Sequence, residues 1–196
     1  MDVFEAIHQR RAVREYRPDP VSRAFVHTIL DAANWAPSAM NHQQWGFVVV
    51  TGRKIREMGE SFRKIIEEYT RNWDASRMRG SPCTREEFVR FAATYGGAPV
   101  VIVLLTDTAE TPDFQRANLE SASAAMQNLL LAATALGIGT CWMTGPLNDE
   151  KALRRILQIP EDKEIVAVTP LGYPASIPEA PVRLDPLLEQ KVRWVE

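Results

Sequence analysis

The feature that most constrains this chain is an uninterrupted apolar run near its middle, Val100-Val101-Ile102-Val103-Leu104-Leu105. Its length and its β-branched residues are typical of a strand. Because no polar residue alternates with the apolar ones, both faces of this strand are expected to be buried. The run therefore predicts a strand at the centre of a sheet.

Other periodic segments predict a mixture of strands and helices without regular βαβ repeats. Asp2 and Ser22 are placed to cap two amphipathic helices, and the second carries Phe25, Ile29, Leu30 and Ala33 on one face. The Ala- and Leu-rich stretch 115–136 is long enough for about six helical turns and ends at Gly137, where a helix C-cap is expected. Further helices are expected at 53–70, at 85–95 and after a cap at Asn148 or Asp149, with a buried strand at 45–51 and other strands at 139–143 and 164–171.

Length and composition narrow the class of protein. With 196 residues, 45% of them hydrophobic, the chain is expected to form a single domain over 1–196. A net charge of −2 argues against nucleic acid or an anionic membrane as the main partner, since either favours a basic balance. The longest apolar stretches, near 98–105 and 129–138, fall short of the ~20 residues that cross a bilayer. The first residues do not resemble a secretory signal, so a cytoplasmic location is expected.

Several common catalytic centres have no counterpart in the sequence. Cys83 and Cys141 are the only cysteines and are expected to be reduced. The histidines, His8, His27 and His42, have no second ligand at metal-binding spacing, so no metal site is predicted. Neither a Gly-x-Ser-x-Gly elbow nor a Walker-type loop is present. This pattern favours chemistry carried by a cofactor, with no catalytic side chain.

Four arginines lie close to the expected end of the first helix: Arg10, Arg11, Arg14 and Arg17. The planar guanidinium group can donate two hydrogen bonds to a phosphate at once, so one interpretation is a site for a phosphate-bearing cofactor. The alternative is a solvated charged segment, because short charge runs are common. This cluster alone leaves both interpretations open.

Two other segments carry groups that can recognise a ligand. Residues 36–45 are dense in amide and hydroxyl groups, which suit the alternating carbonyl and N–H edge of a pyrimidine-like ring. Turn capping by Ser38 and Asn41 explains the same composition. Residues 137–146 contain several glycines, but they lack the third glycine of a dinucleotide-binding loop and follow a helix, which excludes a Rossmann motif. Backbone N–H groups of this turn could still face a ligand.

The C-terminal stretch 174–196 holds too few apolar side chains to pack alone. Val192, Trp194 and Val195 could add a strand to another subunit, so dimerisation is plausible from this segment.

Taken together, the segments 10–14, 36–45 and 127–142, closed by Thr169-Pro170-Leu171-Gly172-Tyr173-Pro174, resemble the FMN-dependent nitroreductase family in order and spacing. The resemblance covers nearly the whole chain. It implies an α+β fold, a three-layer sandwich with a mainly antiparallel sheet flanked by helices. It also implies a domain-swapped homodimer with two FMN sites at the subunit interface and with 174–196 as an arm that reaches the partner subunit.

The resemblance further implies which residues bind FMN. Arg10 and Arg14 match the first motif of the family, Arg11 is a neighbouring candidate, and Ala12 stands where the family usually has Ser. One hydroxyl hydrogen bond, with a net value of ~0.5–1.5 kcal/mol, is therefore missing. The other residues that the resemblance implies are Pro37, Ser38, Ala39, Asn41 and Gln43 from the other subunit, Trp142, Thr144 and Gly145 along the ring, and Arg183 at the phosphate. Many family members carry an acidic residue at the position of Thr144.

The activity implied is reduction of FMN by NAD(P)H, followed in ping-pong fashion by reduction of a nitroaromatic, a quinone or a related small organic acceptor. The alternatives are a specialised flavin enzyme of the same fold, of the reductive dehalogenase or flavin-cleaving type, and a non-catalytic flavin-binding dimer. The region 60–95 decides between the enzymes. Its basic and aromatic side chains either recognise an acidic aromatic substrate or form a solvated helix face, and the second interpretation is favoured. These side chains are Arg63, Lys64, Tyr69, Arg71, Trp73, Arg77 and Arg79.

Overall fold

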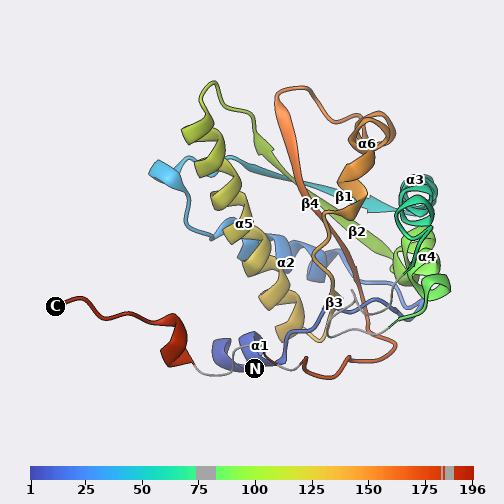
Figure 1. The fold of residues 1–196 in the computed structure, drawn as a ribbon, viewed down its shortest axis with the longest axis horizontal. Coiled ribbons are helices and arrows are strands. Elements are labelled where there is room, and N and C mark those ends of the chain that lie inside the picture. The colour runs from blue at the N-terminus through green and yellow to red at the C-terminus, as the bar shows by residue number, and fades with distance from the viewer. Residues whose placement is uncertain (74–82, 182, 184–187) are drawn as a thin grey trace.

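A computed structural model describes residues 1–73, 83–181, 183 and 188–196 of the chain (Figure 1). Its centre is a sheet with the strand order β1-β2-β4-β3, in which each strand is antiparallel to its neighbours. The strands are β1 (Trp45–Thr51), β2 (Val100–Asp107), β3 (Gly139–Thr140) and β4 (Lys163–Gly172). The predicted central strand is confirmed, since β2 pairs with β1 along one edge and with β4 along the other.

Helices cover both faces of this sheet (Figure 1). Ile102 and Leu104 pack into a core with α2 (Arg23–Asn34) and α5 (Pro112–Ala135). Val101 and Val103 pack into a second core with α3 (Arg53–Tyr69), α4 (Arg85–Thr94) and α6 (Glu150–Leu157). Side chains alternate across a strand, so the apolar run of β2 supplies both cores at once. The predicted α+β three-layer sandwich is confirmed.

Caps fix the ends of several helices. The Asp2 carboxylate accepts the Glu5 N–H at the start of α1 (Val3–Gln9), and Ser22 caps α2 in the same way. Of the two residues expected to cap α6, Asp149 is the one that does so. The described residues also form the short 3₁₀ turns η1 (Ala39–Asn41), η3 (Tyr95–Gly97), η4 (Gly145–Asp149) and η5 (Leu188–Lys191).

Three expectations from the sequence are corrected. The strand at 45–51 exists but is not buried, because β1 lies at the edge of the sheet and Val49 is 43% exposed. Phe25 is exposed, since the apolar face of α2 buries Val26 instead. The strand expected over 139–143 is shorter: β3 ends at Thr140, and the chain touches β4 again only through a single bridge from Met143.

The 24-residue helix α5 spans much of the molecule, and different candidate site segments lie near its two ends (Figure 1). It begins at a Thr111 cap and ends before Gly137, whose φ of +73° is the left-handed conformation expected of a glycine there. Figure 1 shows α1 beside the C-terminal end of α5, whereas the loop that contains η1 lies toward the other end. This arrangement decides which of the candidate site residues meet within one chain.

The C-terminal residues leave the body of the chain (Figure 1). Backbone bonds first hold the chain along residues 15–17, where the N–H of Ala175 donates to the Glu15 carbonyl and that of Arg17 to the Tyr173 carbonyl. Farther on, Trp194 is 85% exposed. The arm over 174–196 stays a prediction. Within the described residues, no helix combines the length and the apolarity needed to cross a bilayer.

Candidate functional site

The segment 10–14 runs in extended form between α1 and the sheet. Ala12 forms a parallel bridge with Thr140, and the N–H of Val13 donates to the Thr140 carbonyl over 2.9 Å. Val13 is buried against Gly139, where an added Cβ would come within 2.9 Å of the Val13 side chain. Because side chains alternate along an extended segment, Ala12 and Arg14 point to the opposite side from Val13. A glycine at 139 thus lets the arginine segment lie directly against the glycine-rich turn.

The structure gives Arg10 and Arg11 different surroundings. Nη1 of Arg11 donates to the backbone carbonyls of His8 and Arg10, each over 2.7 Å. A cation that bonds the last carbonyls of a helix stabilises that end of the helix. Arg10 is the half-buried C-cap residue of α1. Arg11 is therefore committed to the helix end, and Arg10 is the better placed of the two to bind a ligand.

The charges of Arg10 and Arg14 both affect the pKa of Cys141, which lies at the start of the turn that follows β3. Burial raises the pKa of the Cys141 thiol, and the positive charges of Arg14 and Arg10 oppose that rise. Tyr16 holds the same segment, since its buried hydroxyl donates to the Val13 carbonyl over 2.7 Å. Burial also raises the pKa of Tyr16 well above its ordinary value, so it serves as a neutral hydrogen-bond donor.

The turn itself supplies three of the predicted site residues. Trp142 is 38% exposed, and Thr144 is exposed as well. Gly145 opens η4, and a Cβ added there would lie 3.0 Å from the ring of Phe62, so this position tolerates no larger residue without a shift. These residues follow directly on Thr140, which contacts Ala12, and the predicted motifs 10–14 and 142–145 are therefore neighbours.

Ala12 and Arg14 line a cavity of about 540 Å³, here called the α4 cavity. One face of α4 also lines it, with contributions from Cys83, from residues 96–97 and from Ser176 and Pro178. A volume of this size lies within the range of small-molecule sites.

The amide-rich loop is held in an uncommon conformation. Met40, Asn41 and Gln43 have φ values of +51°, +57° and +50°, a region that residues other than glycine seldom occupy. Hydrogen bonds maintain this shape: the Gln43 N–H donates to Oγ of Ser38 over 3.0 Å, and Nε2 of Gln43 donates to Oδ1 of Asn41 over 2.9 Å. Pro37, Asn41 and Gln43 are exposed, so the loop presents its polar groups outward.

Two side chains of α5 anchor this loop. The Ala39 N–H donates to Oγ of Ser121, and the buried Gln44 amide donates to Oδ1 of Asn118 over 2.8 Å. The Oε1 atom of Gln44 has no partner among the described residues. Asn118 and Ser121 were not among the predicted site residues. Their signal in the sequence is weak but present: two polar residues three positions apart interrupt an Ala- and Leu-rich helix on its buried face.

The structure thus brings together some of the predicted site residues and keeps others apart (Figure 1). The segment 10–14 meets Gly139 and Thr140, just before the turn 142–145, whereas the loop 37–43 contacts α5 at Ser121. From Ser121 to Ala135 the helix continues for ~21 Å, at 1.5 Å per residue. Arg183 is exposed in the C-terminal segment. Within one chain, the loop 37–43 and the arginines of 10–14 therefore do not form a common site.

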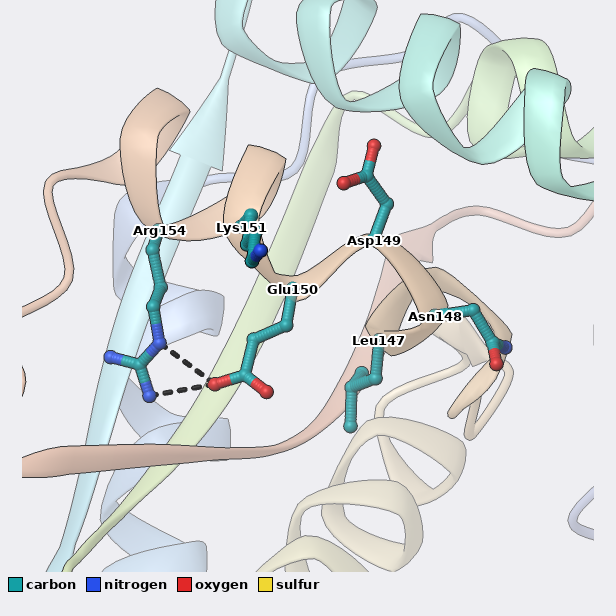
Figure 2. A pocket seen from close by; sticks show the side chains of 6 residues that line it. All are labelled: Leu147, Asn148, Asp149, Glu150, Lys151 and Arg154. Carbon is teal, nitrogen blue, oxygen red and sulfur yellow. Dashed lines mark hydrogen bonds and ion pairs between the residues drawn. The ribbon is translucent and has the colours of Figure 1, made fainter.

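A second depression lies at the start of α6 (Figure 2). It has a volume of about 320 Å³, and the Glu150–Arg154 ion pair forms part of its lining. None of the predicted site residues borders it. In the described ranges, no group of three or more His, Cys, Asp or Glu side chains is placed to hold a metal ion.

Comparisons with known proteins agree with this architecture. The model of the "Nitroreductase family" matches residues 7–173, and the chain belongs to that family. A protein of Methanothermobacter thermautotrophicus named for NADH dehydrogenase/NAD(P)H nitroreductase activity is 36% identical over 99% of this chain and 88% of its own length. The 4-nitrobenzoate reductase of Pseudomonas putida is 26% identical over 88% of this chain and 86% of its own length.

Solved structures show the same fold. A Desulfovibrio desulfuricans chain solved in complex with FMN has a TM-score of 0.70 and 28% identity, over 100% of this chain and 98% of that one. The FMN- and NADPH-dependent nitroreductase NfnB of a sphigopyxis strain has a TM-score of 0.80 and 20% identity, over the full length of both chains. The predicted family, and with it the class of a nitroreductase-type oxidoreductase, is confirmed. The cofactors expected from the sequence, FMN and NAD(P)H, are the ones named for these relatives.

Proposed function

We propose that this chain binds FMN and uses NAD(P)H to reduce nitroaromatics, quinones or related small organic acceptors. The observation that carries the proposal is the Ala12–Thr140 bridge, which ties the arginine segment to the strand that leads into the turn 142–145. Ala12 and Arg14 of the same segment line the α4 cavity. Bound at this site, FMN would supply the redox chemistry, in which NAD(P)H provides a hydride and the acceptor receives two electrons. For a nitro group the balanced reaction consumes one NAD(P)H and one proton and yields a nitroso compound, NAD(P)⁺ and water.

The residues present fit this cofactor. Arg10, half-buried at the end of α1, offers a planar cation for the phosphate. Arg14 lines the cavity, and its positive charge would stabilise the negative charge that the pyrimidine side of a bound flavin gains on reduction. Ala12 leaves this wall small, so a flat ring can approach it. The exposed Trp142 and Thr144 and the half-buried Gly145 would then border the ring face, with no protein acid or base required.

We further propose that the site is completed by a second copy of the chain. The loop 37–43, with its outward amides, lies too far from the arginines to serve the same site within one chain. Exposed apolar side chains mark the surface that a partner would cover, because single chains rarely expose so many: Phe4, Ile7, Trp35, Met40, Phe114 and Leu119. The exposed Trp194 and Val195 support the arm over 174–196, with Arg183 within it, as an element that docks on the partner.

Anaerobic spectroscopy tests the proposal. FMN-loaded protein is mixed with NADH or NADPH, and the loss of flavin absorbance near its visible maximum is followed. We expect bleaching by at least one nicotinamide and recovery of the absorbance on addition of a nitroaromatic or quinone. Recovery only with halogenated acceptors would assign the dehalogenase alternative instead, and no bleaching with either nicotinamide would leave a non-catalytic flavin-binding dimer.

A further inference from the structure

One face of α4 lines the α4 cavity together with Ala12 and Arg14. Glu87, Arg90 and Thr94 line this wall, and their spacing of three and four residues places them on one face of the helix. The wall therefore offers a carboxylate, a guanidinium and a hydroxyl to anything that enters the cavity.

Two of these three polar groups are already committed to the helix. Oε2 of Glu87 accepts the N–H of Thr84 over 2.7 Å and completes the capping box at the start of α4. Oγ1 of Thr94 donates to the Arg90 carbonyl over 2.9 Å. In the described part of the chain, Arg90 makes no ion pair. Arg90 is thus the polar group on this wall with donors to spare.

Other basic residues of the region 60–95 are used elsewhere. Arg63 pairs with Glu67, Arg71 pairs with Glu68, and Nε of Arg85 donates to the Thr70 carbonyl over 3.0 Å. Arg77 and Arg79 lie outside the described residues. For Arg63 and Arg71 these exposed ion pairs fit the favoured interpretation, a solvated helix face. Arg90 was not singled out from the sequence and is the exception.

The α4 wall also has an aromatic character. Phe88 and Phe91 line the cavity beside Arg90, and the ring of Trp73 lies 6.0 Å from that of Phe88. Flat apolar side chains next to a guanidinium form a surface that matches an aromatic ring bearing a carboxylate, since Arg binds carboxylates in a planar, two-point manner.

We propose that Arg90 determines acceptor specificity by binding the carboxylate of an anionic aromatic acceptor. This inference rests on the proposed function, in which the wall of Ala12 and Arg14 serves the flavin and leaves the α4 wall to the acceptor. The other charges that line the cavity are Arg14, Glu15 and Glu87. A neutral acceptor of the same shape gains nothing from Arg90, so the preference is for charge and not for size.

The test compares an acceptor pair of matched shape, 4-nitrobenzoate and 4-nitrobenzamide, on the FMN-loaded dimer. Arg90→Gln is expected to lower kcat/KM for 4-nitrobenzoate at least about tenfold, the effect of losing a charge-assisted hydrogen bond, with 4-nitrobenzamide unchanged. Arg90→Lys keeps the charge but not the two-point geometry, so its kcat/KM for 4-nitrobenzoate is expected to lie between those of the wild type and Arg90→Gln. A second readout is the Kd of benzoate, measured by perturbation of the oxidised flavin spectrum, which should rise by a similar factor.

Arg116→Gln is the matched control. Arg116 is also an exposed arginine, but it lies on α5 and pairs there with Glu120. An equal effect of both variants would overturn the proposal in favour of general electrostatic attraction. A loss of FMN from Arg90→Gln would overturn it by assigning Arg90 to the cofactor. Equal rates of the wild type on both acceptors would also overturn it, while leaving the proposed function standing. A protein that binds no FMN at all would overturn both.

Discussion

Oγ of Ser121, in the middle of α5, accepts the backbone N–H of Ala39 over 3.1 Å, across 82 residues of sequence. The same hydroxyl donates to the Ala117 carbonyl one turn earlier, so its orientation is fixed. Asn118 lies three residues before Ser121 and bonds Gln44 at the other end of the loop. A helix in the core of the fold thereby sets the conformation of the loop that we assign to the partner's flavin.

Removal of the Ser121 hydroxyl should loosen this loop. Ser121→Ala leaves the Ala39 N–H without its acceptor, a loss of ~1–3 kcal/mol for a partly buried donor. If the loop contacts FMN, the Kd of FMN should rise about five- to tenfold in a fluorescence titration. Ser123→Ala is the control, because Ser123 lies on the same helix and bonds no described residue of the loop. Equal Kd values for the two variants would contradict the role given to Ser121.

The two adjacent arginines should behave differently when replaced. Arg10→Ala removes the charge assigned to the phosphate and should weaken FMN binding by about 10- to 100-fold. Arg11→Ala removes bonds to the last carbonyls of α1. Its main effect should be a fall of ~0.5–1.5 kcal/mol in the free energy of unfolding, measured by urea denaturation, with a Kd for FMN within about threefold of the wild type. The reverse order of FMN affinities would contradict the assignment.

Much of the fold could be predicted because its signals are local. The apolar run of β2 and the long stretch of α5 each declare one element, and the caps at Asp2 and Ser22 mark helix starts within the same few residues. The predictions that were wrong concern properties that depend on what surrounds a helix or strand in the fold. The edge position of β1 and the exposure of Phe25 follow from sheet order and helix packing, which no short window of sequence contains.

The site was predicted in part for the same reason. The 10–14 and 142–145 motifs stood out by composition, and their meeting depends on a contact between Val13 and Gly139 that only the fold creates. The anchor at Ser121 carries only a weak local signal, since it is one of several small residues in α5 and stands out only as a polar residue on the buried face of the helix. The wall position of Arg90 requires knowing which face of α4 looks into the cavity.

Tyr95 offers a test of packing that is independent of ligand binding. Its side chain is fully buried, and its hydroxyl has no partner among the described residues. Tyr95→Phe should therefore raise the free energy of unfolding by about 1 kcal/mol, equivalent to ~2–4 °C in Tm. A loss of stability of similar size would show that the hydroxyl is satisfied in solution.

The same variant should respond differently to high pH. Burial raises the pKa of Tyr95, so the folded protein keeps a proton that the unfolded chain loses above its ordinary pKa of about 10. This contribution to stability is complete below pH ~10 and declines as pH rises above that value. In Tyr95→Phe the decline should be shallower, as measured by thermal unfolding at pH 8 and at pH 10.5. Parallel curves for the two proteins would contradict the burial of an ionisable group at this position.

A mixed dimer tests whether one site uses two chains. Asn41→Val should distort the loop, because a β-branched residue is strongly disfavoured at the φ of +57° found there. A dimer with Arg10→Ala in one chain and Asn41→Val in the other contains one doubly altered site and one intact site. The FMN concentration is chosen so that it saturates the wild type but neither variant homodimer. Under this condition the mixed dimer should bind half as much FMN as the wild-type dimer. Binding no greater than that of the homodimers would place both elements in a single chain.

The central claim is that the arginine segment and the turn beside it hold FMN. Titration of the apoprotein with FMN, followed by quenching of flavin fluorescence and by the visible spectrum, tests it most directly. We expect saturation at one FMN per chain and a yellow protein. A colourless protein that neither quenches FMN fluorescence nor gains thermal stability from added FMN would contradict the account.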